Sequence, residues 1–307
     1  MIVRPHFVWL DGHLLAALEP HVSVFDRGFQ LGDGLFETLR ARRGVPIEWA
    51  EHLERLREGA ADLRIRAPDA STLRTGLAEL LDHEGLSGPG DDRFPAGDAA
   101  VRITVTRGVM DGRGTLPEGW RAHPPTVAIQ AWSSTPPSAE ALERGVHAVI
   151  STVRRDPASP LAGIKTISRA DHVLARLQAD AAGADDALFL TLDGRVSEAT
   201  SANVAALIDG RLVTPPIGAA ILVGTTRTWL LAQAAMGRLG IDAIERDLRP
   251  ADLLAADEAF LTSSVAGIVP LTALDGRPIG SGRPGELTRR LRAEREAWID
   301  RESLAGG

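Results

Sequence analysis

The chain has 307 residues, which is long for a single hydrophobic core and predicts two packed domains. Its formal net charge of −7 disfavours a nucleic-acid partner or an anionic membrane surface, and no segment approaches the roughly 18 apolar residues of a membrane span. Cysteine and tyrosine are absent, which excludes disulfides, cysteine-metal sites, thiol nucleophiles and any mechanism that needs a phenol. We expect a cytoplasmic protein, because cysteine is absent and the N-terminus lacks a long apolar signal segment.

In the N-terminal half, alternating apolar residues predict strands, and apolar residues at helical spacing predict helices. Asp11-Gly12 and Arg43-Gly44 are typical of tight turns. Residues 85–97 are rich in Gly, Pro and Asp and are expected to form a loop, and Ser71 is expected to cap a helix. The predicted strands cover 7–15 as a hairpin, 22–25, 35–40, 101–106 and 126–132, and the predicted helices cover 48–57 and 71–82.

The segment Ser133-Ser-Thr-Pro-Pro-Ser138 has the composition of a linker. Beyond it, the predicted strands cover 146–153, 187–192, 202–208 and 211–214, and the predicted helices cover 170–182, 225–239 and 285–303. Strands, helices and hairpins are mixed in both halves. The sequence therefore predicts an α+β fold with an N-terminal domain at 1–132, a linker at 133–138 and a C-terminal domain at 139–307.

Of the 34 basic residues, only Lys165 is a lysine. A deprotonated lysine amine forms a Schiff base with a carbonyl, whereas a guanidinium does not. The neighbouring residues are apolar on one side and polar on the other, so they are able to hold an amine at lowered pKa. A leftover surface lysine is the alternative interpretation.

Two later segments add to this lysine. Glu198 stands at a predicted strand end, and Gly224-Thr225-Thr226 stands at a predicted helix start, where N–H groups, hydroxyls and the helix dipole favour an anion. Ser264, in a hydroxyl-rich turn, is a weaker candidate for the same anion. A lysine, a carboxylate and an anion site match the aldehyde, the ring nitrogen and the phosphate of pyridoxal phosphate. Taken singly, Glu198 is more typical of an exposed hairpin carboxylate, and residues 224–226 are equally compatible with an ordinary capped helix.

A series of motifs, in order along nearly the whole chain, resembles the class IV (fold type IV) pyridoxal-phosphate aminotransferases. That family includes branched-chain and D-amino-acid aminotransferases, R-selective amine transaminases and 4-amino-4-deoxychorismate lyase. The motifs are Asp26-Arg-Gly with Gly32-Asp-Gly-Leu-Phe-Glu-Thr38, His52-Leu-Glu-Arg55-Leu56, Gly163-Ile-Lys165, Glu198-x-Thr-x-x-Asn203, Ile221-Leu-x-Gly-x-Thr226-Arg227, and Phe260 to Pro270. The resemblance implies a two-domain, D-amino-acid-aminotransferase-like fold whose C-terminal domain carries the cofactor lysine.

The resemblance also implies roles for single residues. Lys165 would bind pyridoxal phosphate covalently and then shuttle the substrate proton, and Glu198 would bind the pyridine nitrogen. The implied phosphate ligands are Arg55, Thr225, Thr226 and Ser264.

Substrate recognition is expected to differ from some relatives. Phe36 stands where they use a tyrosine, so a hydrogen bond to cofactor or substrate is lost. Arginines on or after strand 101–106 are candidates to bind a substrate carboxylate, because a bidentate guanidinium suits that group. Arg102 is the first candidate and Arg113 the second, because an unpaired arginine pointing inward would be costly to bury. Arg107 is a third arginine in this region, and at least one of the three is expected to have a structural role.

The sequence thus predicts an aminotransferase that moves an amino group between an amino acid, or an amine, and a 2-oxo acid by a ping-pong mechanism. The family resemblance implies a homodimer. The alternative is 4-amino-4-deoxychorismate lyase, which uses the same cofactor but releases pyruvate and 4-aminobenzoate, and no motif separates the two. A non-enzymatic, arginine-rich binding protein is a remote alternative, which the negative net charge disfavours.

Overall fold

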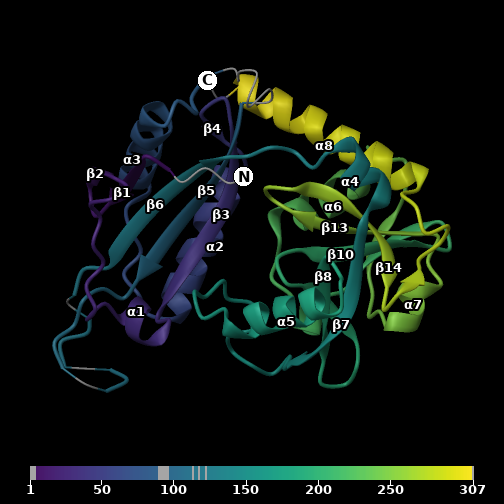
Figure 1. The fold of residues 1–307 in the computed structure, drawn as a ribbon, viewed down its shortest axis with the longest axis horizontal. Coiled ribbons are helices and arrows are strands. Elements are labelled where there is room, and N and C mark those ends of the chain that lie inside the picture. Colours follow the sequence, from purple (N-terminus) through teal and green to yellow (C-terminus); the bar gives the residue numbers. More distant parts are fainter. Residues whose placement is uncertain (1–4, 89–96, 113, 117, 122, 306–307) are drawn as a thin grey trace. The chain divides into compact units, whose positions relative to one another are not determined.

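The computed structural model describes residues 5–88, 97–112, 114–116, 118–121 and 123–305. The chain forms two compact units, coloured along the sequence in Figure 1. The first unit comprises Met1–Thr135, Lys165–Ser168 and Ile299–Gly307, and the second comprises Pro136–Ile164 and Arg169–Trp298. This division differs from the predicted one, because the short segment with Lys165 and the end of the chain group with the N-terminal residues.

In the first unit, the described residues form a six-stranded antiparallel sheet with the order β2-β1-β6-β5-β3-β4. The strands are β1 (Phe7–Leu10), β2 (His13–Ala16), β3 (Gly34–Arg42), β4 (Val45–Pro46), β5 (Asp98–Thr106) and β6 (Thr126–Ser133). The helices are α1 (Arg27–Leu31), α2 (Trp49–Asp62) and α3 (Ala70–His83). Helices α2 and α3 pack on one face of the sheet (Figure 1).

Strand alternation decides which side chains face these helices. Trp9 lies against Gly76 of α3, so the face that carries Trp9, with Val101 and Ile103, is the helix-covered face. Those residues are buried in a core with leucines of α2 and α3. Arg102 points to the opposite face because it lies between Val101 and Ile103. The sheet therefore presents Arg102 away from its helices.

The second unit is built around a mixed sheet with the order β12-β11-β10-β13-β14-β7-β8-β9, and β15 pairs with β14. Its strands are β7 (Val146–Arg155), β8 (Asp186–Thr191), β9 (Val196–Ala199), β10 (Asn203–Ile208), β11 (Arg211–Thr214), β12 (Ala243–Glu245), β13 (Glu258–Ser263), β14 (Gly267–Leu274) and β15 (Arg277–Pro278). The helices are α4 (Ala139–Arg144), α5 (Ala170–Ala181), α6 (Thr225–Ala235), α7 (Pro250–Leu254) and α8 (Glu286–Ala305, to Trp298 in this unit), with a 3₁₀ turn at Ile217–Ala219.

Helix α5 packs on β7 and β8 through Ala175, Ala179 and Phe189. Leu230 of α6 and Leu291 of α8 share a second apolar cluster with Phe260. The α+β prediction is confirmed by this mixture of helices and sheets in both units.

Some element predictions are wrong. Residues 22–25 do not form a strand; they lead into α1, whose N-cap Asp26 accepts hydrogen bonds from the N–H groups of Gly28 and Phe29. The N-cap of α3 is Asp69 rather than Ser71, because the Asp69 carboxylate accepts from the Ser71 and Thr72 N–H groups. Most of the predicted loop 85–97 lies outside the described residues. Among the residues that the structure describes, no helix is long and apolar enough to cross a membrane.

Candidate active site

The segment that carries Lys165 is attached to strand β3 of the first unit. The Phe36 N–H donates to the Lys165 carbonyl oxygen and the Ile167 N–H donates to the Gly34 carbonyl oxygen, both at 3.0 Å. This close approach explains a glycine of the motif, because a Cβ at Gly34 would lie 2.6 Å from the Val105 carbonyl oxygen and 2.9 Å from Ile167 Cδ1. The Lys165 segment is therefore held by an isolated bridge between Leu35 and Thr166, and its close approach requires glycine at position 34.

Phe36 lies beside both of the cationic groups predicted near the substrate. Lys165 Nζ lies 4.6 Å from the centroid of the Phe36 ring, and Arg102 Cζ lies 3.9 Å from the same centroid. Arg102 Nε donates to Thr104 Oγ1 at 3.2 Å, and burial lowers the pKa of the guanidinium. Within the described part of the chain, no carboxylate lies at ion-pair distance from Arg102. Its remaining donors are thus suited to an anion brought by a ligand.

Arg107 has a structural role. Its Nε and Nη2 donate to the two carboxylate oxygens of Asp33, at 2.7 and 2.9 Å, and its Nη1 and Nη2 donate to the carbonyl oxygens of Arg64 and Leu63. A guanidinium with these partners is occupied in holding the loop after β5. Arg113 lies outside the described residues.

Arg55 is held by a buried carboxylate. Its Nε and Nη2 donate to the two oxygens of Glu37, at 2.7 and 2.6 Å, and His52 Nδ1 lies 2.7 Å from the same carboxylate. Burial opposes ionisation of Glu37, but the hydrogen bonds and charges of Arg55 and His52 outweigh it and lower the pKa to about 2. Glu37 belongs to the segment Gly32–Thr38 on which the family resemblance rests, but no role was predicted for it.

Glu198 is buried in the second unit, with an exposed fraction of 6%, so it is not an exposed hairpin carboxylate. Its Oε2 accepts from the Leu222 N–H at 2.9 Å and from Asn203 Nδ2 at 3.1 Å, and its Oε1 lies 3.5 Å from Arg155 Nη2. Two hydrogen-bond donors on Oε2 and a guanidinium at ion-pair distance from Oε1 favour the charged carboxylate. The group is therefore prepared to bind a cationic partner, such as a protonated ring nitrogen.

The predicted anion site lies at the start of α6. Gly224 is the N-cap, Thr225 and Thr226 begin the helix, and Thr225 Oγ1 lies 3.1 Å from Ser264 Oγ. A Cβ at Gly224 would lie 2.0 Å from Asn203 Oδ1, the residue whose amide also binds Glu198. Because Gly224 has no side chain, Asn203 can lie against the start of α6 while its amide binds Glu198. Helix amides with adjacent hydroxyls suit a phosphate.

The predicted residues are divided between the two units: Phe36, Arg55, Arg102 and Lys165 belong to the first, and Glu198, Thr225, Thr226 and Ser264 belong to the second. A primary amine, a buried ionised carboxylate, an arginine and a hydroxyl-rich helix start together fit the functional groups of pyridoxal phosphate.

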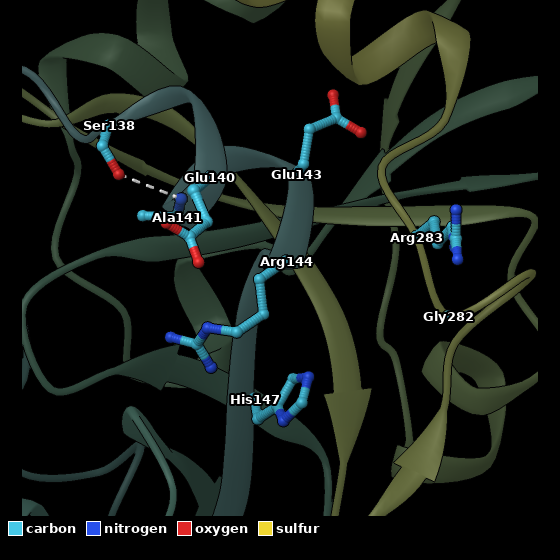
Figure 2. A pocket seen from close by; sticks show the side chains of 8 residues that line it. All are labelled: Ser138, Glu140, Ala141, Glu143, Arg144, His147, Gly282 and Arg283. Atoms are coloured by element: carbon cyan, nitrogen blue, oxygen red, sulfur yellow. Dashed lines mark hydrogen bonds between the residues drawn. The ribbon is translucent and has the colours of Figure 1, made fainter.

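A separate hollow of about 730 Å³ opens on the second unit beside α4 and β7 (Figure 2). It is lined by side chains that include Arg144, His147 and Arg283, and by none of the predicted site residues. Arg144 Nη1 and Nη2 each lie 2.7 Å from a carboxylate oxygen of Asp185, so this cation is already neutralised. The hollow is not the candidate active site.

Comparisons with known proteins identify the family of the chain. Residues 34–274 match the family model described as amino-transferase class IV. The chain is 35% identical to a putative branched-chain-amino-acid aminotransferase of Methanocaldococcus jannaschii, over 93% of each chain. The structure of the branched-chain aminotransferase from Escherichia coli superposes with a TM-score of 0.85 at 25% identity, covering 96% of this chain and 95% of that one. The structure of 4-amino-4-deoxychorismate lyase from Pseudomonas aeruginosa superposes with a TM-score of 0.77 at 34% identity, covering 94% of this chain and 98% of that one.

The fold thus matches the fold type IV class, as the sequence predicted. The chain belongs to the class IV aminotransferase family.

Proposed function

We propose that the protein is a pyridoxal-phosphate-dependent aminotransferase. It transfers an amino group between an amino acid, or an amine, and a 2-oxo acid by a ping-pong mechanism, and it acts as a homodimer. The observation that carries the proposal is Glu198, a buried carboxylate with two donors on Oε2 and a guanidinium 3.5 Å from Oε1. Asn203 bonds to this carboxylate and lies against Gly224 at the start of α6. Among donor amines, the branched-chain amino acids are the first to test, because of the similarity to the Methanocaldococcus jannaschii protein.

Pyridoxal phosphate, when bound, supplies an aldehyde for amines and a protonated ring that withdraws electrons from the substrate α-carbon. Lys165 holds the cofactor through its amine and carries the proton that leaves and returns at the substrate. Glu198 keeps the proton on the ring nitrogen by its negative charge. Arg55, with Thr225, Thr226 and Ser264, binds the phosphate.

On the substrate side, Arg102 binds the carboxylate. Arg102 is partly buried, and no carboxylate of the described residues pairs with it. An anionic substrate would offset the free-energy cost of desolvating this guanidinium. Phe36, which carries no hydroxyl, supplies an apolar wall beside the reacting amine.

The second candidate is 4-amino-4-deoxychorismate lyase, and the observation in its favour is the 34% identity to the Pseudomonas aeruginosa enzyme of that name. The lyase reaction needs the same lysine, acid and phosphate site. The two candidates differ in their products, since one leaves the amino group on the cofactor and the other releases pyruvate.

The test is a set of single-turnover reactions in which the cofactor-loaded enzyme meets one donor at a time and the cofactor spectrum is followed. We expect branched-chain or D-amino acids to convert the cofactor to its amine form, and a 2-oxo acid to restore it. Pyruvate release from 4-amino-4-deoxychorismate, with no donor converting the cofactor, would establish the lyase instead. Absence of cofactor absorbance after incubation with pyridoxal phosphate would reject both.

A further inference from the structure

Glu198 is the buried end of a series of polar groups, all within the second unit. Arg155, the last residue of β7, lies between Glu198 and His172 of α5. Its Nη2 is 3.5 Å from Glu198 Oε1, and its Nη1 is 3.2 Å from His172 Nε2. His172 Nδ1 in turn lies 2.6 Å from the Asp171 carboxylate. The series runs from an exposed carboxylate, through the imidazole and the guanidinium, to the buried acid.

The chemistry of these groups determines the tautomer of His172. A guanidinium only donates hydrogen bonds, so His172 Nε2 facing Arg155 accepts one. Nδ1 therefore carries the proton and donates a hydrogen bond to the Asp171 carboxylate. Burial and the charges of Arg169 and Arg155 lower the pKa of His172 to about 4, against the opposing effect of Asp171, which agrees with a neutral ring.

The other contacts of Arg155 show what His172 contributes. Its Nη2 donates to the carbonyl oxygens of Ala162 and Ala220, at 3.0 and 3.1 Å, so one end of the guanidinium is fixed by backbone. The Nη1 end is oriented by His172, whose ring packs edge-to-face on Phe189 with centroids 4.9 Å apart. Because the guanidinium is planar, fixing both ends holds its positive charge at ion-pair distance from Glu198.

We propose that His172 is a positioning residue for Glu198: as a neutral acceptor it holds Arg155 against the carboxylate, and thereby keeps that carboxylate ionised and directed at the cofactor. The proposal rests on the proposed function, in which Glu198 binds the ring nitrogen of pyridoxal phosphate. It assigns to α5 a role in the electrostatics of the site, in addition to its packing on the sheet.

The experiment compares His172→Phe with His172→Gln. Phenylalanine retains an aromatic ring against Phe189 but removes the acceptor, whereas glutamine restores an acceptor oxygen near the position of Nε2. We expect His172→Phe to lower kcat and cofactor affinity about tenfold each, the loss expected for one buried charge-assisted hydrogen bond. It should also shift the pH dependence of the cofactor absorbance, and His172→Gln should recover most of each change.

A double-mutant cycle separates this role from general damage to α5. In a Glu198→Gln background, His172→Phe should have little further effect on cofactor affinity or absorbance, because the group on which it acts is gone. Gln178→Met is the matched control, since Gln178 also joins α5 to β7, by its bonds to Ser151 and Thr152, but does not contact Arg155. This variant should retain the wild-type absorbance and affinity.

Two results would overturn the proposal: additive losses in the cycle, or wild-type absorbance and affinity in His172→Phe. Should His172→Phe fail to fold, ¹⁵N NMR of the wild-type ring, assigned with His172→Gln, provides the same decision. A neutral ring protonated at Nδ1 at neutral pH supports it, and a cationic ring or the other tautomer contradicts it. Failure of the wild-type protein to bind pyridoxal phosphate would instead reject the proposed function, so the two failures are distinguishable.

Discussion

At the scale of single residues, Lys165 offers the most direct test of the site. No other side chain carries a primary amine, because this is the only lysine of the chain. Borohydride reduction of the cofactor-loaded enzyme, followed by peptide mass mapping, is expected to place the pyridoxyl group on Lys165. Lys165→Ala should carry no label on its side chains. A label found solely on the N-terminal amine would contradict the assignment.

Arg102 is predicted to distinguish substrates by their carboxylate. Arg102→Leu should lower kcat/KM for amino acids by roughly 10- to 150-fold, as expected for loss of a charge-assisted hydrogen bond worth about 1.5–3 kcal/mol. Simple amines without a carboxylate should be much less affected. Thr104→Val serves as the control, because it removes only the hydroxyl that accepts from Arg102 Nε. Equal losses for both donor classes would mean that Arg102 is structural.

Glu37 predicts a pH dependence of stability. Its pKa of about 2 in the folded protein lies below the ordinary value of 4.5, so the unfolded chain binds the proton more tightly. Glu37 therefore contributes stability that is fully present above about pH 4.5 and is lost as the pH falls toward 2. The contribution is about 3 kcal/mol from a shift of this size. Urea unfolding between pH 5 and 3, which spans about half of this window, should show a shallower pH dependence of stability for Glu37→Gln. The variant of an exposed carboxylate on α2, Glu54→Gln, should retain the wild-type dependence, and a shared slope for all three proteins would contradict the prediction.

The residues of the candidate site could be predicted only where chemistry or resemblance marks them. Lys165 was identified by its amine, and Glu198 by its order in the chain relative to the lysine and the Gly-Thr-Thr segment. Their supporting partners are long-range: Arg155 meets Glu198, and Glu37 meets Arg55, only through sheet pairing and helix packing. A local sequence pattern does not predict such long-range contacts.

At the scale of elements, local signals predicted most strands and helices close to their observed bounds. The strand predicted at 22–25 was wrong because these residues lead into the N-cap of α1, and the apolar side chains Val22, Val24 and Phe25 are exposed rather than buried in a sheet. Strands β12 to β15 were not predicted. Strand β13 pairs with β10 and β14, and the short strands β12 and β15 pair with β11 and β14. Pairing between distant segments is the information that local periodicity lacks.

Gly224 provides a prediction for one element, the start of α6. Gly224→Ala should displace Asn203, because the added Cβ would lie 2.0 Å from its Oδ1. We expect stability to fall by about 1–3 kcal/mol, as for overpacking, and cofactor affinity to fall because Asn203 supports Glu198. The control is Gly218→Ala, where nothing lies within 4 Å of the new Cβ. Thermal unfolding and cofactor titration measure both effects, and equal behaviour of the two variants would contradict the packing argument.

At the scale of the whole molecule, the length and the linker composition indicated two domains, but the structure groups Lys165–Ser168 with the first unit. The reason is the backbone pairing of this segment with Gly34 and Phe36, more than a hundred residues earlier in the chain. A domain boundary predicted from local composition cannot detect a short segment that pairs with a distant part of the chain. The chain thus contributes the lysine to one unit and the acid to the other.

The last prediction concerns the stability of the whole protein with and without its cofactor. A ligand that binds only the folded state at a hundredfold excess over its Kd stabilises that state by about 2.7 kcal/mol, so removal of pyridoxal phosphate should lower Tm. Pyridoxal, which lacks the phosphate, should stabilise much less at the same concentration, because Arg55, Thr225, Thr226 and Ser264 gain no ligand. In Arg55→Ala, the effect of pyridoxal phosphate should shrink while the effect of pyridoxal stays unchanged. Equal stabilisation by the two compounds would show that the lysine alone supplies the affinity and that the helix start binds no phosphate.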